Sequence, residues 1–417
     1  MTRLVSAASA LMLLAACVSQ VGIGDGPAEP DPAGLHHSLL VLDSHLDTPA
    51  FFHNGDYKFS QRGSYADDGS QVDLPRIVEG GLDGGFWVIF TRQGELNEAS
   101  YVAARTTALL RQMSIREFAA KYADTVELAF NAADAQRIHD SGKIVVYQSM
   151  ENAYPLGEDL SLLQSFYVGG LRMVGPVHGG NNQFSDSSTG KEVLYGGLSP
   201  LGEDLVREAN RLGIIVDASH ASDDALRDMI ALSTTPVILS HSGPDGVYEH
   251  PRNVPDELLV ALADSGGVIQ VNAFPAYLEA LQRSLELEAA LEELSAEFGD
   301  FSSMSDERVR EFLAARLKIF KQFPPPRSTF EKYVEHLLYV LELVGPDHVG
   351  IGADWDGGGG VAGMEDVASL PNITAALEGA GYSAEDIANI WSGNLLRLMR
   401  EVEAAKTATL ASPGVLQ

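Results

Sequence analysis

Cysteine is almost absent from this chain of 417 residues, in which Cys17 is the only one. A single thiol cannot form a disulfide within the chain, so the body of the protein must be stabilised by its apolar core. Everything after residue 17 also lacks a cysteine nucleophile. Catalysis by a thiol is therefore excluded for that part of the chain.

Basic residues are scarce as well. The chain has 28 Lys and Arg against 58 Asp and Glu, which gives a formal net charge of −30. Such a charge repels the phosphates of nucleic acids and the headgroups of anionic lipids. We therefore expect no nucleic-acid partner, and we interpret the acidity as a solvated surface that keeps the protein soluble. With 45% hydrophobic and 21% charged residues, the composition excludes general disorder.

The apolar run at the N-terminus is too short to cross a membrane. Arg3 supplies a small positive region, residues 7–14 are apolar, and two alanines precede Cys17. This pattern resembles a bacterial lipobox, which predicts a lipoprotein signal peptide over residues 1–16, then a lipidated Cys17 and a flexible tether over residues 17–33. The alternative is an ordinary secretory peptide with an incidental cysteine. Either interpretation predicts an exported protein, and the first predicts a lipoprotein of the cell envelope, anchored to the membrane and facing the periplasm.

Near-continuous apolar segments alternate with helical ones along the rest of the chain, which is typical of parallel strands buried on both faces. Eight such strands close a (β/α)8 barrel, and a barrel of this length is common. We predict an α/β fold of this TIM-barrel type over residues 34–405, followed by a tail over 406–417. A doubly wound open sheet is the alternative, but no Gly-x-Gly-x-x-Gly follows the first strand. The predicted strands end near residues 42, 90, 151, 178, 220, 241, 272 and 354.

Residues 276–327 are more than a connection between the seventh and eighth strands requires. The segment is rich in Glu, Leu and Ala and predicts a helical insertion. We favour a solvated helical hairpin on the rim of the barrel, with a working lid as the alternative, since loops at this face usually border the site.

Polar side chains follow six of the predicted strands at the point where each strand ends. Reacting groups of such barrels lie at the C-terminal ends of the strands, so these side chains should meet at one mouth. Because side chains alternate along a strand, His45 and Asp47 face the same way. Imidazoles and carboxylates together suit metal ions better than isolated capping or core roles. The set is His45, Asp47, Glu151, His178, His220, His241 and Asp354.

Two divalent ions a few ångströms apart need a bridging anion, and Glu151 at the end of a central strand is the candidate. His45 and Asp47 would complete one site, and His220 with His241 the other. Open positions would remain for a shared water, whose pKa falls to about 7 on zinc.

Several ordered motifs, spread over nearly the whole predicted domain, resemble those of the membrane (renal-type) dipeptidases, a family of binuclear zinc peptidases. The motifs are His45-Leu46-Asp47, the isolated Glu151 after a strand, Gly197-Leu198-Ser199-Pro200-Leu201-Gly202, Asn210-Arg211-Leu212-Gly213, Asp217-Ala218-Ser219-His220, Ser240-His241-Ser242, Pro251-Arg252-Asn253-Val254-Pro255 and Gly350-Ile351-Gly352-Ala353-Asp354.

The resemblance implies roles for individual residues. His45, Asp47 and Glu151 match the ligands of one zinc ion, while Glu151, His220 and His241 match those of the other. His178 matches a histidine that contacts the scissile group and supports the oxyanion, and Asp354 matches the acid/base that carries a proton to the leaving amine. Arg252 matches the residue that receives the terminal carboxylate of the substrate; on its own it would be interpreted as a surface ion pair. We also expect Tyr277 to contact the substrate.

Taken together, the sequence predicts a zinc-dependent dipeptidase with two zinc ions bridged by Glu151 and a hydroxide that attacks the peptide carbonyl. Relatives cleave dipeptides with an L residue first and an L or D residue second, and they are often homodimers, which is the expectation here. One alternative is an amidohydrolase acting on another amide or ester, although such enzymes usually carry His-x-His on the first strand and a bridging lysine. Another is a zinc- or peptide-binding lipoprotein without turnover.

Overall fold

The computed structural model describes residues 32–52, 57–299, 304 and 306–407. The predicted signal peptide, Cys17, nearly all of the predicted tether and nearly all of the predicted tail lie outside these residues. Within the described part of the chain, no helix has both the length and the apolar character needed to cross a membrane.

Eight parallel strands form a ring. Five of them follow one another in the order β1 (Leu42–Leu46), β2 (Gly84–Ile89), β4 (Ile144–Met150), β5 (Leu171–Val174) and β6 (Ile215–Val216). The other three are β7 (Ile238–Pro244), β9 (Val268–Val271) and β10 (Val349–Ile351), in the order β10, β9, β7.

Two single bridges join these sheets into a closed barrel. Asp217, just after β6, pairs with Ile238 of β7, and Leu46 of β1 pairs with Trp355, just after β10. Each junction has a backbone hydrogen bond, from Ala218 N to Ile238 O at 2.8 Å and from Asp47 N to Trp355 O at 2.9 Å. The predicted (β/α)8 fold and its eight strands are confirmed.

Two short strands were not predicted. β3 (Val126–Leu128) pairs with the start of β4, and β8 (Asn253–Val254) pairs with the end of β7. Neither lies in a continuous apolar segment of the kind that marked the eight barrel strands, so the local pattern did not reveal them.

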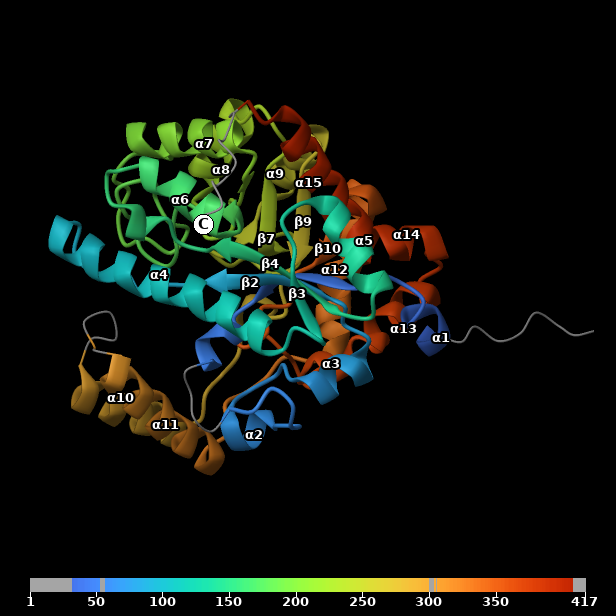
Figure 1. Cartoon of the computed structure of the whole chain (residues 1–417). Helices are drawn as coiled ribbons and strands as arrows, with labels where there is room; N and C mark the ends of the chain where they lie inside the picture. The colour runs from blue at the N-terminus through green and yellow to red at the C-terminus, as the bar shows by residue number, and fades with distance from the viewer. Residues whose placement is uncertain (1–31, 53–56, 300–303, 305, 408–417) are drawn as a thin grey trace, which may run out of the picture. The chain divides into compact units, whose positions relative to one another are not determined.

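Helices surround the strands, as Figure 1 shows. The helix α7 illustrates how the sequence sets their ends: the Ser199 side chain accepts a hydrogen bond from Gly202 N, Pro200 occupies the first turn, and Gly213 takes the left-handed conformation after the last. The helices near the barrel are α1 (Pro32–His36), α2 (Tyr65–Asp68), α3 (Leu74–Gly80), α4 (Glu98–Lys121), α5 (Ala132–Asp140), α6 (Ser161–Gly169), α7 (Pro200–Leu212), α8 (Asp223–Leu232), α9 (Asp256–Asp264), α12 (Phe330–Val344), α13 (Pro371–Gly379), α14 (Ala384–Ala388) and α15 (Asn394–Ala405).

Apolar side chains occupy the early positions of the barrel strands. They belong to one buried cluster that also contains side chains of α5 and α15. The strand members are Leu42, Phe86, Val145, Tyr147, Met173, Ile215, Ile238 and Val268. Most of these residues lie in the first half of their strands. Near the C-terminal ends, apolar side chains such as Met150 and Val271 belong to a second buried cluster and alternate with polar residues such as Glu151 and Asn272.

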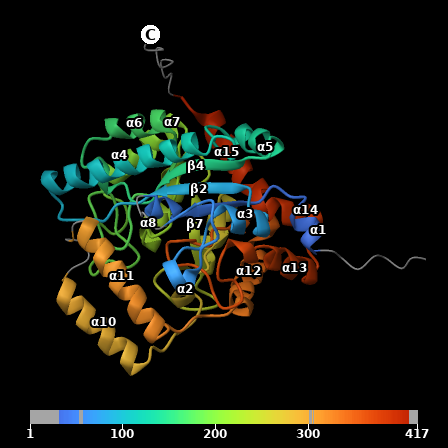
Figure 2. The ribbon, with the colours of Figure 1, turned by 60° about the horizontal axis from the view of Figure 1, so that its bottom comes forward.

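The segment between β9 and β10 contains two helices, α10 (Leu285–Phe298) and α11 (Asp306–Gln322), which lie beside each other at one side of the barrel (Figures 1 and 2). Arg92, which follows β2, donates a hydrogen bond to the carbonyl of Met304 at 2.9 Å. At the other end of α11, Lys321 donates to the carbonyl of Asp67 in α2 at 3.1 Å. The two helices therefore border the C-terminal face of the barrel.

Candidate metal centre

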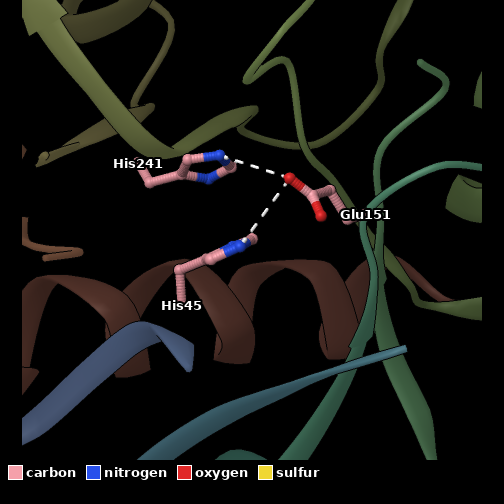
Figure 3. Close-up of side chains that lie close together, drawn as sticks. All are labelled: His45, Glu151 and His241. Atoms are coloured by element: carbon pink, nitrogen blue, oxygen red, sulfur yellow. Dashed lines mark ion pairs between the residues drawn. The ribbon is translucent and has the colours of Figure 1, made fainter. Parts of the chain in front are cut away.

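The Glu151 carboxylate is the centre of the predicted site. It directly follows β4 and is buried. Its Oε1 atom lies 3.0 Å from His220 Nε2, 3.5 Å from His241 Nε2, 3.7 Å from His178 Nε2 and 3.8 Å from His45 Nε2. Figure 3 shows two of these imidazoles, His45 and His241, pointing at the same carboxylate oxygen. Four histidines, each from a different strand or the segment that follows it, thus converge on one atom, as the barrel topology predicts.

Three sets of side chains each bring their ligand atoms within 4.8 Å of one another. Glu151 belongs to two of these sets and His45 to two, so the sets are contiguous. The sets are His45, Glu151 and His241; Glu151, His178 and His220; and His45, Asp47 and Asp354. All seven predicted strand-end residues therefore lie in one cluster, although His45 lies within β1 and His241 within β7 rather than after them.

The donor atoms of this cluster fit a pair of cations. Among the residues that the structure describes, the buried His45 Nε2 atom has no hydrogen-bond partner, although Asp47 Oδ2 lies 3.4 Å away. His220 Nε2 and His241 Nε2 lie 2.9 Å apart. Burial, with the charge of Arg252 adding to it, lowers the pKa of both imidazoles well below the ordinary value. Two neutral nitrogens at this distance need a proton or a cation between them, and imidazole with carboxylate is the ligand set of zinc.

The carboxylates of the cluster also favour a bound proton or cation. Burial raises the pKa of Glu151 and of Asp354, and Asp47 raises both further. Burial lowers the pKa of His45, but Glu151 and Asp47 outweigh that effect and raise it to about 10. These shifts favour the protonated forms of the ligands, and a cation held by the same groups would replace the proton.

Asp354 and His220 each have a strained backbone conformation. Their φ angles are 65° and 69°, in the left-handed region that residues with a side chain rarely adopt. Asp354 lies three residues after β10, and its carboxylate reaches the cluster through this turn. Such strain is characteristic of functional positions.

Arg252 lies beside the cluster rather than at the surface. It is buried, and its guanidinium donates to the carbonyl of His241 at 3.1 Å. In the described part of the chain, Arg252 Nε has no hydrogen-bond partner, and no ion pair includes the Arg252 guanidinium. The ring of Tyr277 lies under the guanidinium, 5.4 Å from its central carbon, and Phe274 stacks on that ring at 4.4 Å. The structure thus brings Arg252 and Tyr277 together, and the surface ion pair considered for Arg252 is wrong.

His178 belongs to the cluster through its contacts with Glu151 and His220. Its ring lies 4.3 Å from that of His220 and 5.0 Å from that of Phe90. Burial and the nearby charge of Arg252 lower the pKa of His178 to about 4, so the imidazole is neutral near pH 7.

Two residues near the site were not singled out from the sequence. Asn272 directly follows β9, and its amide donates to the carbonyl of His241 at 3.2 Å. Gly357 lies so close to Asp354 and Asp47 that a methyl group there would collide with both carboxylates. Asn272 occupied a strand end like the others, so its position was the available signal; the role of Gly357 depends on contacts that no local pattern reveals.

A closed parallel barrel with four histidines and three carboxylates gathered at its C-terminal rim defines a metal-dependent hydrolase of the barrel class. Residues 33–413 match the sequence model of the family described as membrane dipeptidase (peptidase family M19). The chain belongs to this family, and it is a hydrolase of the dipeptidase class. The resemblance predicted from the motifs is confirmed, which favours the peptidase over both alternatives.

Curated and solved relatives agree with this assignment. The dipeptidase tcpJ of Claviceps purpurea is 32% identical over 337 residues, which are 80% of this chain and 69% of that protein. The structure of the probable dipeptidase PvdM from Pseudomonas aeruginosa superposes with a TM-score of 0.76 at 34% identity, covering 90% of this chain and 98% of that one. A metallopeptidase from Rhodobacter sphaeroides, bound to a phosphinate mimic of L-Ala-D-Ala, has the same fold, with a TM-score of 0.68 at 24% identity over 87% of this chain and 99% of that one.

Proposed function

We propose that this protein is a zinc-dependent dipeptidase that holds two zinc ions and cleaves dipeptides with an L residue first and an L or D residue second. The observation that supports this best is the convergence of four imidazole Nε2 atoms within 3.8 Å of Glu151 Oε1. His45, Asp47 and Glu151 would hold one ion, and Glu151, His220 and His241 the other. When bound, the two ions would supply a water of lowered pKa, near ~7, as the nucleophile.

Asp354 is the proposed acid and base. Its carboxylate lies in the same set as the Asp47 carboxylate and the His45 imidazole, beside the ligands that would hold the first ion. Burial raises its pKa above that of an ordinary aspartate, which brings it closer to neutral pH and suits proton transfer. The carboxylate would accept the proton of the water and return it to the departing amine.

Arg252 is the proposed anchor for the substrate. A buried guanidinium without a carboxylate partner is costly unless a ligand supplies one, and a guanidinium binds a carboxylate with two parallel hydrogen bonds. The terminal carboxylate of a dipeptide would fill this need, and the fixed position of Arg252 would place the preceding peptide bond at the cluster. Tyr277 would form the wall beside the second side chain.

His178 is the proposed support for the oxyanion. Because its imidazole is neutral, Nε2–H can donate a hydrogen bond to the carbonyl oxygen as negative charge develops there. A cationic residue would instead repel the metal ions of the cluster.

Export and anchoring are part of the proposal as well. The lipobox-like sequence before Cys17 supports a lipid anchor on that residue and a location in the cell envelope, and the dimeric state of many relatives supports a homodimer.

A direct test is an assay of the zinc-loaded protein on L-Ala-L-Ala, L-Ala-D-Ala and the C-terminal amides of both. We expect release of alanine from the free dipeptides and little from the amides, because an amide cannot pair with Arg252. A folded protein with two bound zinc ions that cleaves neither dipeptide would disprove the proposed activity.

A further inference from the structure

We propose that Asp217 and Ser240 are positioning residues that determine which nitrogen of His241 carries the proton, and so present the other nitrogen to a metal ion. The inference rests on the proposed function, in which His241 is a metal ligand. Neither residue was assigned a role above, and neither touches the substrate.

The three side chains form a chain of hydrogen bonds across two neighbouring strands. Ser240 Oγ lies 2.6 Å from Asp217 Oδ2 and 2.9 Å from His241 Nδ1. All three residues are buried. The other oxygen of Asp217 accepts from the backbone N–H groups of Ser219 and Ser240, at 3.0 Å each. The carboxylate is thus held in one orientation, with Oδ2 facing the serine.

The direction of each hydrogen bond follows from the chemistry of the groups. A carboxylate has no proton to give, so the Ser240 hydroxyl must donate its single hydrogen to Asp217 Oδ2. The serine oxygen can then only accept from His241 Nδ1–H. Ser219 Oγ, the other candidate acceptor for that hydroxyl, is 3.5 Å away and cannot compete with a contact of 2.6 Å.

A neutral imidazole carries one proton, so a proton on Nδ1 leaves a free electron pair on Nε2. His241 Nε2 is the atom that lies 3.5 Å from Glu151 Oε1 and 2.9 Å from His220 Nε2. The pair Asp217 and Ser240 therefore prepares His241 as a ligand before any ion arrives. An outer partner of this kind typically raises metal affinity by about 10–100-fold.

The neighbouring ligand lacks such a device. His220 Nδ1 is buried and has no hydrogen-bond partner among the residues that the structure describes. The tautomer of His241 is thus determined by a serine and a carboxylate. We expect the affinity for the ion that His241 binds to be the one most affected by substitution of Asp217 or Ser240.

Asp217→Asn tests the direction of the hydrogen bonds at almost constant shape. The two backbone N–H groups require an acceptor, so the amide oxygen would take the place of Oδ1 and the amide NH2 would face Ser240. The NH2 group would donate to the serine oxygen, and the serine hydroxyl would turn to His241 Nδ1. His241 would then carry its proton on Nε2, which is the wrong tautomer for a ligand.

The experiment uses the full-length protein with zinc. Chelator competition measures the affinity for each ion, and ¹⁵N NMR of labelled histidine identifies the protonated nitrogen of His241. Ser240→Ala, which removes the intermediary, is the second variant. Ser44→Ala is the matched control, because Ser44 Oγ is equally buried and donates to the carbonyl of Ser240 at 2.6 Å without touching the imidazole.

We expect D217N to bind one of its two zinc ions about 10–100-fold more weakly, S240A to show a loss in the same direction, and S44A to bind both like the natural protein. We also expect His241 to carry its proton on Nδ1 in the natural protein. Zinc affinities of folded D217N and S240A equal to that of S44A, or a proton on Nε2 of the natural His241, would overturn the inference. A natural protein that binds no zinc would instead disprove the proposed function.

Discussion

The exchange of Gly357 for alanine should damage the site while leaving the fold intact. A methyl group at this position would lie 2.1 Å from Asp354 Oδ1 and 2.2 Å from Asp47 Oδ2, whereas ordinary contacts begin at 3.4 Å. Each carboxylate oxygen must therefore retreat by about 1.2 Å. Metal sites tolerate shifts of about 0.2 Å in ligand distance, and a displacement of about 1 Å at reacting groups costs on the order of 100-fold in rate. We expect kcat/KM to fall by at least about 100-fold, or about 2.7 kcal/mol of transition-state stabilisation.

The assay combines kcat/KM on L-Ala-L-Ala with the zinc content of the purified protein and its thermal unfolding. The backbone of Gly357 lies outside the left-handed region, so alanine should not strain it and Tm should change little. Gly180→Ala is the control, because its added methyl group would meet Gln93 Nε2 at an ordinary 3.6 Å. Natural activity and zinc content in G357A would refute the placement of the two carboxylates against this glycine.

Two further predictions concern the chemistry, one concerns the membrane anchor and one concerns stability. Asp354→Asn should lower kcat by about 100-fold or more while a Tm shift on zinc addition persists, as expected for loss of general acid/base catalysis, and natural kcat would exclude the role. Arg252→Gln should reduce kcat/KM on dipeptides by about 100-fold yet barely change the rate on dipeptide amides; equal losses on both would argue against carboxylate binding. Cys17→Ala should release the protein from membranes in cell fractionation, and continued membrane association would disprove the anchor. Burial lowers the pKa of His36 to about 4, so the unfolded chain binds a proton on this residue more readily than the folded chain. The free energy of unfolding should therefore be constant above pH 6.5 as far as His36 is concerned, and should fall by at most about 3 kcal/mol as the pH drops to 4. Chemical denaturation over this pH range measures the fall, and His36→Gln should reduce it.

The strand ends were predictable because a barrel concentrates chemistry at one rim, and each ligand follows or ends an apolar segment. The exact boundaries of the strands could not be predicted. β1 begins at Leu42 rather than Leu39, since Val41 N bonds to the Asp83 side chain instead of a neighbouring strand. His45 thus lies within the strand, but the two-residue alternation still places it and Asp47 on one face.

Contacts between elements distant in sequence could not be predicted from local patterns. The sequence places Asp217 before His220 and Ser240 before His241, but their hydrogen bond exists only because β6 and β7 are neighbours in the barrel. The same limit applies to Gly357, whose constraint comes partly from Asp47, on the opposite side of a barrel junction.

The strained residues of the site lie at the two places where the ring of strands is weakest. The β6–β7 junction has a single bridge, and His220 follows it with φ 69°; the β10–β1 junction also has a single bridge, and Asp354 directly precedes it with φ 65°. A left-handed conformation costs a residue with a side chain about 1–3 kcal/mol, so the chain would relax there unless other contacts held it. One of those contacts is made by Asp217, which accepts a hydrogen bond from the Ser240 side chain across the β6–β7 junction. The other is made by Asp43, which accepts a hydrogen bond from Ala353 N, beside Asp354, at 3.0 Å. Two buried aspartates that contact no substrate therefore stabilise the turns that direct a metal ligand and an acid/base toward the same cluster.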